Sequence, residues 1–447
     1  MARDLTQGPI TKMIFKLALP GVLSLLGVTA NHFIDGVWVG RLGPKALAAI
    51  APASFVIWIV YSLVDIMPIG LVAVISRYYG EKNLEKASEI AQKAGQFIIA
   101  VSFMFLVPGM IFSRNILTMV GVSAEVVKLG TIYLEITFLM LPALFVGEVF
   151  FSIFRAVGDT TTPMKLTLVA IMGNMIFDPL LIFGIGPFPA MGIAGAALAT
   201  VIGYMIALAL GFWEIRRGKL PFKIWSPKLI RPDFPLYWRL ARVGIPMAIS
   251  GIIFSLVYLI LSRVAAPFGD YVVASFKVGQ LIESVSFMVC FGFAQATASM
   301  VGQNLGAKQP GRAEKSVWGA LGIVSIFTLI ITVSLYFFAE HITWLFTSDE
   351  STITAAVYYL KIIALSQIFM GIEIVMEGAF GGAGNTMPPM LVSIVGTGLR
   401  IPMAILFISM LGLGYPGIYW ALTVSTILKG ATILVWFRAG RWKLKTV

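Results

Sequence analysis

Twelve long apolar stretches constrain this chain more than any other feature of its sequence. Crossing a hydrocarbon core of about 30 Å takes roughly twenty helical residues. Stretches near that length lie at residues 13–39, 47–75, 94–112, 130–154, 166–184, 192–213, 243–264, 272–302, 317–339, 355–380, 389–411 and 418–437. Backbone polar groups in lipid must be satisfied within the segment, so these stretches are expected to be helices. The predicted fold class is an all-α integral membrane protein with twelve transmembrane helices.

The charge distribution predicts how the helices are oriented. Only 12% of the residues are charged, against about a quarter in soluble domains. The net charge is +12, and most of the 33 Lys and Arg residues fall in segments on the same side as the N-terminus. The richest of these segments is residues 214–242. Positive residues mark the cytoplasmic side, so both termini are expected to be cytoplasmic, and the charge is not read as a nucleic-acid-binding surface.

The chain repeats its turn residues at a spacing of 226. Pro20 matches Pro246, and "GDTTTPM" at 158–164 matches "GNTMPPM" at 384–390. Glycine and proline set the backbone between helices, so their recurrence indicates two copies of one helical unit. Units with an even number of crossings are parallel repeats, related by a pseudo-twofold axis along the membrane normal.

This repeat predicts three regions. An N-terminal lobe of six helices covers residues 1–213, a cytoplasmic linker loop covers 214–242, and a C-terminal lobe of six helices covers 243–447. The substrate path is expected to lie between the two lobes.

Two aspartates within the first lobe are the strongest functional candidates. Asp35 and Asp178 each lie near the outer end of an outward-running span, and an intramembrane carboxylate is costly unless it has a function. Asn31 and Asn174 each precede one of these acids by four residues, which places the amide on the same helix face. Carboxylate and amide oxygens suit a proton or a hard cation such as Na⁺.

The second lobe lacks this arrangement and carries a different set of polar residues. The positions equivalent to Asp35 and Asp178 are Leu261 and Ala404, so ion handling is expected in the first lobe alone. The intramembrane charged residues of the second lobe are Glu283, Glu373, Glu377, Arg400 and Lys429. Their opposite signs favour internal ion pairs, and a second coupling site is the alternative.

Enzyme chemistry is not indicated. The sequence has no G-x-x-x-x-G-K-[ST] phosphate loop and no dinucleotide fingerprint, so no ATP-driven motor is encoded. It has two histidines and one cysteine, and they form no evident metal or nucleophile constellation. No cofactor is expected beyond a coupling ion, H⁺ or Na⁺.

Three motifs in order resemble the MATE multidrug efflux family, within it the DinF-type and archaeal branch. They are "DGVWVGRLGPKALAA" at 35–49, "RAVGDTTTPM" at 155–164 and "NMIFDPLLIFG" at 174–184, and the similarity runs from end to end. The resemblance implies a secondary antiporter in the prokaryotic cytoplasmic (inner) membrane. It would act as a monomer that exports lipophilic cationic small molecules in exchange for H⁺ or Na⁺.

The resemblance also assigns roles to residues. Asp35, Asn174 and Asp178 would form the cation site, and Pro20 would be the bending point of the first helix. The threonine that completes this site in some relatives corresponds to Thr200, with Ala196 as the alternative match.

Two other transporter classes remain as alternatives. A lipid-linked precursor flippase of the wider MATE-like superfamily would be expected to carry a cationic central cavity, whereas the first lobe offers acids. A porter of the major facilitator type usually has G-x-x-x-D-R-x-G-R between its second and third helices, where this chain has "SRYYGEKNLEKASEIAQK" at 76–93.

Overall fold

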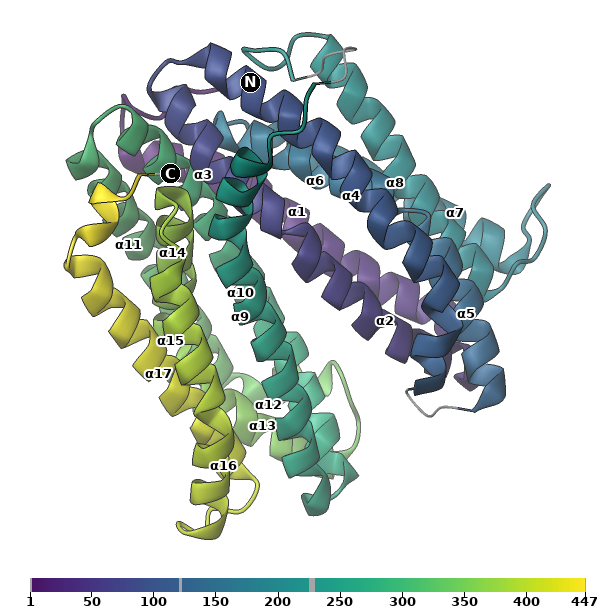
Figure 1. Ribbon diagram of the computed structural model, residues 1–447. Helices are drawn as coiled ribbons and strands as arrows, with labels where there is room; N and C mark the ends of the chain where they lie inside the picture. Colours follow the sequence, from purple (N-terminus) through teal and green to yellow (C-terminus); the bar gives the residue numbers. More distant parts are fainter. Residues whose placement is uncertain (1, 120–122, 225–229, 447) are drawn as a thin grey trace. The chain divides into compact units, whose positions relative to one another are not determined.

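The computed structural model describes residues 2–119, 123–224 and 230–446, and every regular element in these ranges is helical. The chain divides into two compact units. Unit 1 contains residues 1–5 and 23–241, and unit 2 contains residues 6–22 and 242–447. In Figure 1 the helices from purple to teal, up to residue 216 and apart from the start of the first helix, build unit 1, and the green-to-yellow helices belong to unit 2.

The helices of unit 1 follow the chain in order. They are the later part of α1 (Ile10–Gly40), then α2 (Pro44–Val64), α3 (Ile66–Gly80), α4 (Leu84–Met119), α5 (Ala124–Phe138), α6 (Leu141–Ala156), α7 (Thr161–Phe183), α8 (Ile193–Arg216) and the first residues of α9 (Phe234–Ala265).

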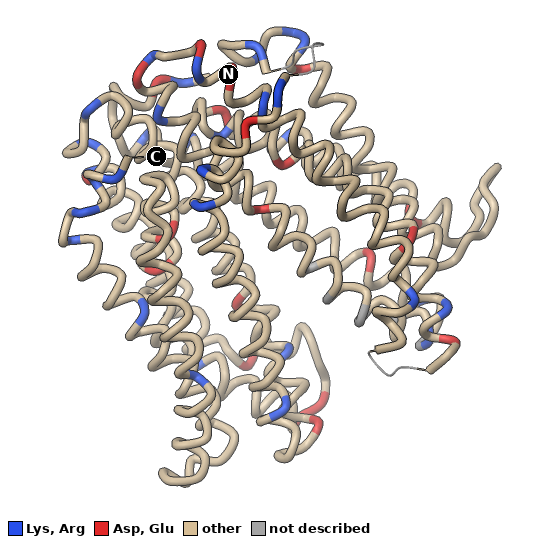
Figure 2. The backbone as a smooth tube through the Cα atoms, in the orientation of Figure 1, with Lys and Arg blue, Asp and Glu red and all other residues tan. Residues whose placement is uncertain are grey.

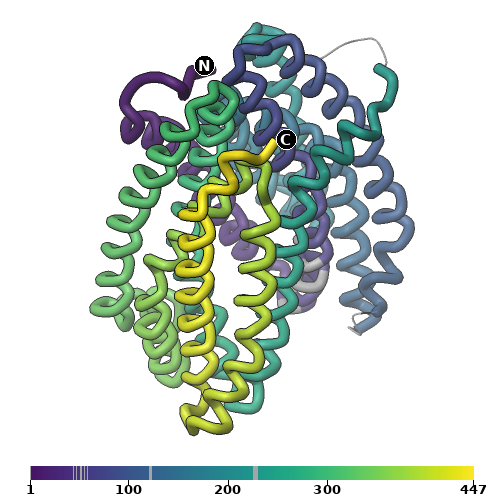
Figure 3. The backbone as a smooth tube through the Cα atoms, turned by 60° about the vertical axis from the view of Figure 1, so that its left-hand side comes forward, coloured from purple at the N-terminus to yellow at the C-terminus, as the bar shows by residue number. Residues whose placement is uncertain are grey.

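The remaining helices form unit 2 together with the first part of α1. They are the rest of α9, then η1 (Ala266–Phe268), α10 (Asp270–Gly306), α11 (Pro310–Phe337), α12 (Ala339–Trp344), α13 (Glu350–Ala364), α14 (Gln367–Ala383), α15 (Met387–Gly398), α16 (Arg400–Ser409), α17 (Pro416–Arg438) and η2 (Arg441–Leu444). Figure 3 shows the yellow α17 running alongside α15 and α16, and these helices are in contact.

Twelve membrane spans are confirmed over the described residues, although two of them are bent. Ten helical stretches are long and apolar enough to cross a bilayer, and two of them, Ile59–Gly80 and Met387–Ser409, include a short break between helices. Two further spans are pairs, α5 with α6 bent by 46° and α13 with α14 bent by 59°. The predicted span 47–75 is likewise two helices, α2 and α3, which meet at Asp65.

Proline explains where two of these helices end. Pro68 and Pro142 lie in the first turns of α3 and α6. Proline has no N–H, so neither residue can donate to the carbonyl four residues earlier, Val64 or Phe138. Those two residues are the last of α2 and α5. Proline is tolerated in the first turn of a helix, so a new helix begins there.

The backbone repeats at the spacing that the sequence indicated. Lys82 and Lys308 are the non-glycine residues with positive φ in the described chain, at 59° and 57°, and they are 226 positions apart. Gly43 and Gly269 have φ of 103° and 111°, and Gly158 and Gly384 have φ of 78° and 73°, again 226 positions apart. The break between α5 and α6 recurs between α13 and α14 at the same spacing. One helical unit therefore occurs twice.

Helix α1 belongs to both units. It is continuous through Pro20, yet residues up to Val22 pack in unit 2 and residues from Leu23 pack in unit 1. Within unit 2, Phe15 packs edge-on against Phe293 with ring centroids 6.1 Å apart. A Cβ on Gly292 would lie 2.5 Å from Val22 Cγ2, so glycine at this position permits the close approach of α10 to α1.

The connection between α8 and α9 rests on α4 within unit 1. It runs from Arg217 to Asp233, and residues 225–229 of the expected linker lie outside the described part. Ile230 N donates to Gln96 Oε1 over 2.9 Å, and Lys93 Nζ pairs with Asp233 at 2.9 Å. Figure 2 shows Lys and Arg gathered at the end of each unit that carries a chain terminus.

Candidate functional site

Asp35 lies on the part of α1 that packs in unit 1, and its side chain is half-buried. The amide of Asn31, one turn earlier, donates to both of its carboxylate oxygens over 3.4 and 3.2 Å. This is the contact that the four-residue spacing predicted. His32 is exposed and interacts electrostatically with Asp35.

Asn174 joins three helices at this site. Its amide is oriented by its neighbours, because one end faces acceptors and the other faces a hydroxyl. In the orientation that satisfies both ends, the nitrogen donates to Asp35 Oδ1 over 2.8 Å and to Asn31 Oδ1 over 3.0 Å. The oxygen accepts from Thr200 Oγ1 over 3.1 Å. Asn174 on α7 therefore connects α1 with α8, and Thr200, rather than Ala196, supplies the hydroxyl.

The two acids meet in this network. Asp35 and Asp178 interact with each other as neighbouring carboxyl groups. The donors converge on Asp35, whereas Asp178 Oδ2 is buried and receives no donor from the described residues. Only 1% of Asp178 is exposed, so this oxygen cannot be satisfied by bulk solvent. A proton or a small cation would satisfy it.

Glycines let α7 and α8 approach closely enough to form the site. A Cβ on Gly203 would lie 2.5 Å from Ala170 O, and a Cβ on Gly195 would lie 2.5 Å from Leu181 O. Small residues at such contacts allow the backbones of membrane helices to pack against each other. The same closeness brings Thr200 of α8 within hydrogen-bonding distance of α7.

A buried apolar cluster brings together residues of α1, α7 and α8 with residues of two further helices. Its members come from α1, α2, α5, α7 and α8, and they are Val39, Ala46, Ala49, Val126, Ile182, Ile193 and Ala196. Asn174 is 3% exposed, so its hydrogen bonds form away from bulk water. Polar contacts inside a protein are stronger than in water.

All five predicted cation-site residues come together, and the predicted hinge lies apart from them. The structure groups Asp35, Asn31, Asn174, Asp178 and Thr200. Pro20 is fifteen residues before Asp35, about 22 Å along α1. It lies just before the point where the packing of α1 changes from unit 2 to unit 1.

The charged residues of unit 2 form an internal network around one ion pair. Lys429 Nζ pairs with Glu373 Oε1 at 2.8 Å, and Glu377 interacts electrostatically with both residues. Arg400 is 3% exposed and donates to the hydroxyls of Ser425 and Thr426, each over 3.1 Å.

Glu283 completes this network with neutral partners. It accepts from Tyr359 over 2.8 Å and from Gln367 over 3.4 Å. It also interacts electrostatically with Arg400 and Lys429. The polar side chains of unit 2 are thus largely engaged with one another.

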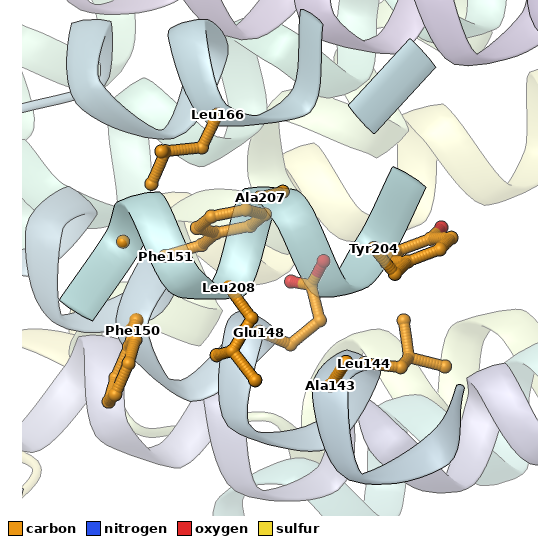
Figure 4. A pocket seen from close by; sticks show the side chains of 11 residues that line it. Ala143, Leu144, Glu148, Phe150, Phe151, Leu166, Tyr204, Ala207 and Leu208 are labelled. Carbon is orange, nitrogen blue, oxygen red and sulfur yellow. The ribbon is translucent and has the colours of Figure 1, made fainter. Parts of the chain in front are cut away.

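A second polar group in unit 1 was not singled out from the sequence. Tyr61 and Tyr204 share a hydroxyl–hydroxyl hydrogen bond of 2.9 Å, and Glu148 pairs with Arg155 at 3.4 Å. Glu148 and Tyr204 line a small cavity whose other walls are apolar, and Figure 4 shows the Glu148 carboxylate between Phe151 and Tyr204. The opposite charges seven residues apart in α6 were the available sequence signal.

The chain is similar to known proteins over nearly its whole length. A family profile described as MatE matches it twice, at residues 20–180 and 246–406. The second match begins 226 residues after the first, the spacing of the repeated turns. The "Probable multidrug resistance protein NorM" of Thermotoga maritima is 26% identical over 439 residues, covering 98% of this chain and 94% of the relative.

Another relative and a solved structure extend the comparison. The "FAD transporter" of Shewanella oneidensis is 27% identical, covering 95% of this chain and 94% of the relative. The structure of a MOP superfamily transporter from Pyrococcus furiosus matches with a TM-score of 0.92 at 21% identity, covering 99% of this chain and 98% of that one. At this identity the likeness concerns the fold.

Proposed function

The chain belongs to the MatE family of membrane transporters, and from that premise we propose that it exports multiple lipophilic cationic compounds in exchange for H⁺ or Na⁺. The observation that carries the exchange is the acid pair. Asp35 receives the nearby amide donors, while Asp178 Oδ2 is buried without one, so the pair holds one proton or small cation at a time. The pair needs no cofactor beyond that ion.

The exchange works by competition between the ion and the substrate. Binding of a cation at Asp35 and Asp178 favours a state with low affinity for the substrate, and release of the cation restores high affinity. Coupling requires the two ligands to favour different states, since equal affinity for both shifts nothing. An inward-moving cation gains about 2.3 kcal/mol per 100 mV of membrane potential, which biases the cycle towards export.

Helix α1 is the proposed connection between the ion and the rest of the protein. Asp35 lies on its unit 1 part, and Pro20 lies on its unit 2 part, two residues before the change of unit. A proline inside a helix removes one hydrogen bond and permits bending at that point. Occupation of Asp35 changes the packing of α1, and Pro20 absorbs the change. We place both termini in the cytoplasm and the protein in the prokaryotic inner membrane, acting as a monomer.

Flux from proteoliposomes tests this function. A cationic dye is loaded inside, and its efflux is followed under an imposed pH gradient and, separately, under a Na⁺ gradient of equal size. Efflux that one gradient accelerates, and that collapse of the gradient stops, is the expected result. Efflux that neither gradient changes would contradict secondary transport. Scrambling of a labelled lipid in the same vesicles, without dye flux, would favour the flippase alternative.

A further inference from the structure

The polar groups of unit 1 continue beyond the acid pair. Tyr204 lies on α8 one turn after Thr200, so the two side chains share a helix face. Its hydroxyl shares a 2.9 Å hydrogen bond with that of Tyr61 on α2. Tyr204 interacts electrostatically with both Asp35 and Glu148. The hydroxyl pair is therefore coupled to Asp35 of the acid pair and to a third carboxylate.

Glu148 is that third carboxylate, and it adjoins a cavity. The cavity walls are apolar except for Glu148 and the Tyr204 hydroxyl (Figure 4). It has room for about one water molecule and not for a drug-sized compound, so it suits proton movement rather than substrate binding. Glu148 is 26% exposed, and its pairing with Arg155 at 3.4 Å keeps a cation beside it.

Asp65 continues the series at the break between α2 and α3. It interacts electrostatically with Glu148 and Arg155. Its side chain is exposed although it lies within the span Ile59–Gly80. An intramembrane carboxylate faces water or protein rather than lipid, because contact with lipid is costly. Asp178 is 1% exposed, the Glu148 side chain is 26% exposed and Asp65 is exposed, so these three acids differ in their access to solvent.

We propose that Glu148 is a second proton-carrying station, which takes the coupling proton from the Asp35–Asp178 pair and passes it towards Asp65. The proton leaves the acid pair and enters the Tyr204–Tyr61 hydroxyl pair, each hydroxyl accepting one proton as it gives up its own. The Glu148 carboxylate gains the proton at the far end, and no other bond changes. The charged and titratable groups that face Glu148 are Asp65, Arg155, Tyr61 and Tyr204.

This inference rests on the proposed exchange with protons. It predicts what happens after the Asp35–Asp178 pair loses its proton. Arg155 lies 3.4 Å from the Glu148 carboxylate, so Glu148 has its ion-pair partner in place once the proton has left. Substrate binding does not involve Glu148, because its cavity is too small. Removal of its carboxylate should therefore separate proton-driven flux from substrate binding.

Glu148→Gln in proteoliposomes makes that separation measurable. Dye affinity is expected to stay within twofold of wild type, and exchange of labelled for unlabelled dye without a gradient should persist. Efflux driven by a pH gradient should fall at least tenfold. Glu148→Asp, which keeps a titratable group, should restore part of that loss. Glu125→Gln is the matched control, because Glu125 forms an exposed ion pair with Lys45.

Three results would overturn the inference. The first is gradient-driven efflux in Glu148→Gln that equals wild type. The second is a loss of dye affinity and of dye exchange in that variant as large as its loss of gradient-driven efflux. The third is wild-type efflux that is driven by Na⁺ with no proton movement. If Glu148→Gln does not fold, Tyr204→Phe removes one hydroxyl of the route and should lower proton-driven efflux in the same selective way. Wild type without any gradient-driven efflux would instead refute the proposed function itself.

Discussion

The Asn174 amide donates to Asp35 Oδ1 over 2.8 Å and thereby ties α7 to α1. The same side chain accepts from Thr200, so one residue holds three helices around the acid pair. This amide and that of Asn31 both donate to Asp35, whereas Asp178 Oδ2 receives no donor from the described residues. Among those residues, Asp178 Oδ2 is therefore the oxygen of the acid pair that lacks a positively charged or donating partner. In the proposed exchange, an ion completes this site.

Asp178→Asn should abolish gradient-driven efflux while leaving the protein folded. The new amide can donate to Asp35 and so imitates a permanently occupied site. Efflux under whichever gradient, pH or Na⁺, drives the wild type is expected to fall at least tenfold. Elution of the variant as a single species, with an unfolding temperature near that of wild type, checks that it is folded. Glu125→Gln, an exposed change from carboxylate to amide, serves as control. Wild-type efflux in Asp178→Asn would contradict a coupling role for this residue.

Thr200→Val should weaken the site without destroying it. Valine keeps the branched shape but removes the hydroxyl that donates to the Asn174 oxygen over 3.1 Å. Loss of one hydrogen bond costs about 1 kcal/mol, so the coupling-ion concentration that gives half-maximal efflux is expected to rise about fivefold. Thr200→Ser keeps the hydroxyl and should stay near wild type. If valine and serine behave alike, the hydroxyl has no part in ion binding.

Gly203→Ala should disturb the site through the packing of α7 against α8. The added Cβ would lie 2.5 Å from Ala170 O, a backbone atom, so the helices must separate. Overpacking of this kind costs about 1–3 kcal/mol, and both the unfolding temperature and gradient-driven efflux should fall. Gly95→Ala is the control, because nothing lies within 4 Å of its added Cβ. Equal stability of the two variants would argue against a close contact at Gly203.

Lys429→Met tests whether the network of unit 2 is structural. The ion pair with Glu373 is 5% and 10% exposed, so the substitution leaves a buried carboxylate without its cation. Breaking a buried pair typically costs about 3–5 kcal/mol, which a detergent unfolding titration can resolve. The double variant Lys429→Met/Glu373→Gln removes both charges and should recover most of the stability. A double variant no more stable than the single one would show that Glu373 does not depend on Lys429.

Local spacing made the core of the site predictable from sequence. Asn31 and Asp35, like Asn174 and Asp178, are four residues apart on helices, so their alignment needs no knowledge of the fold. Thr200 could not be separated from Ala196 in this way, because the choice depends on how α8 packs against α7. Tyr204 and Glu148 were missed for the same reason: their relation crosses helices far apart in the sequence.

The fold was predictable where composition dominates and less so where helices bend. Twelve spans and their repetition follow from hydropathy and from turn glycines such as Gly158 and Gly384. Pro68 and Pro142 were themselves local signals of the breaks that precede them. Each apolar stretch is long enough to be interpreted as one continuous span, so the breaks were not predicted. The break at Leu365 and Ser366 has no proline beside it, and only its repeat relation to the break at Leu139 indicates it.

The most direct test of the central claim counts protons when substrate binds. Calorimetric titration of the purified transporter with a cationic dye, repeated in two buffers of different ionisation enthalpy, gives the number of protons released per dye bound. Competition at the Asp35–Asp178 pair predicts about one proton for wild type in the absence of Na⁺, and none for Asp35→Asn or Asp178→Asn. The same release from wild type and from both variants would contradict the assignment of the coupling site to these two acids.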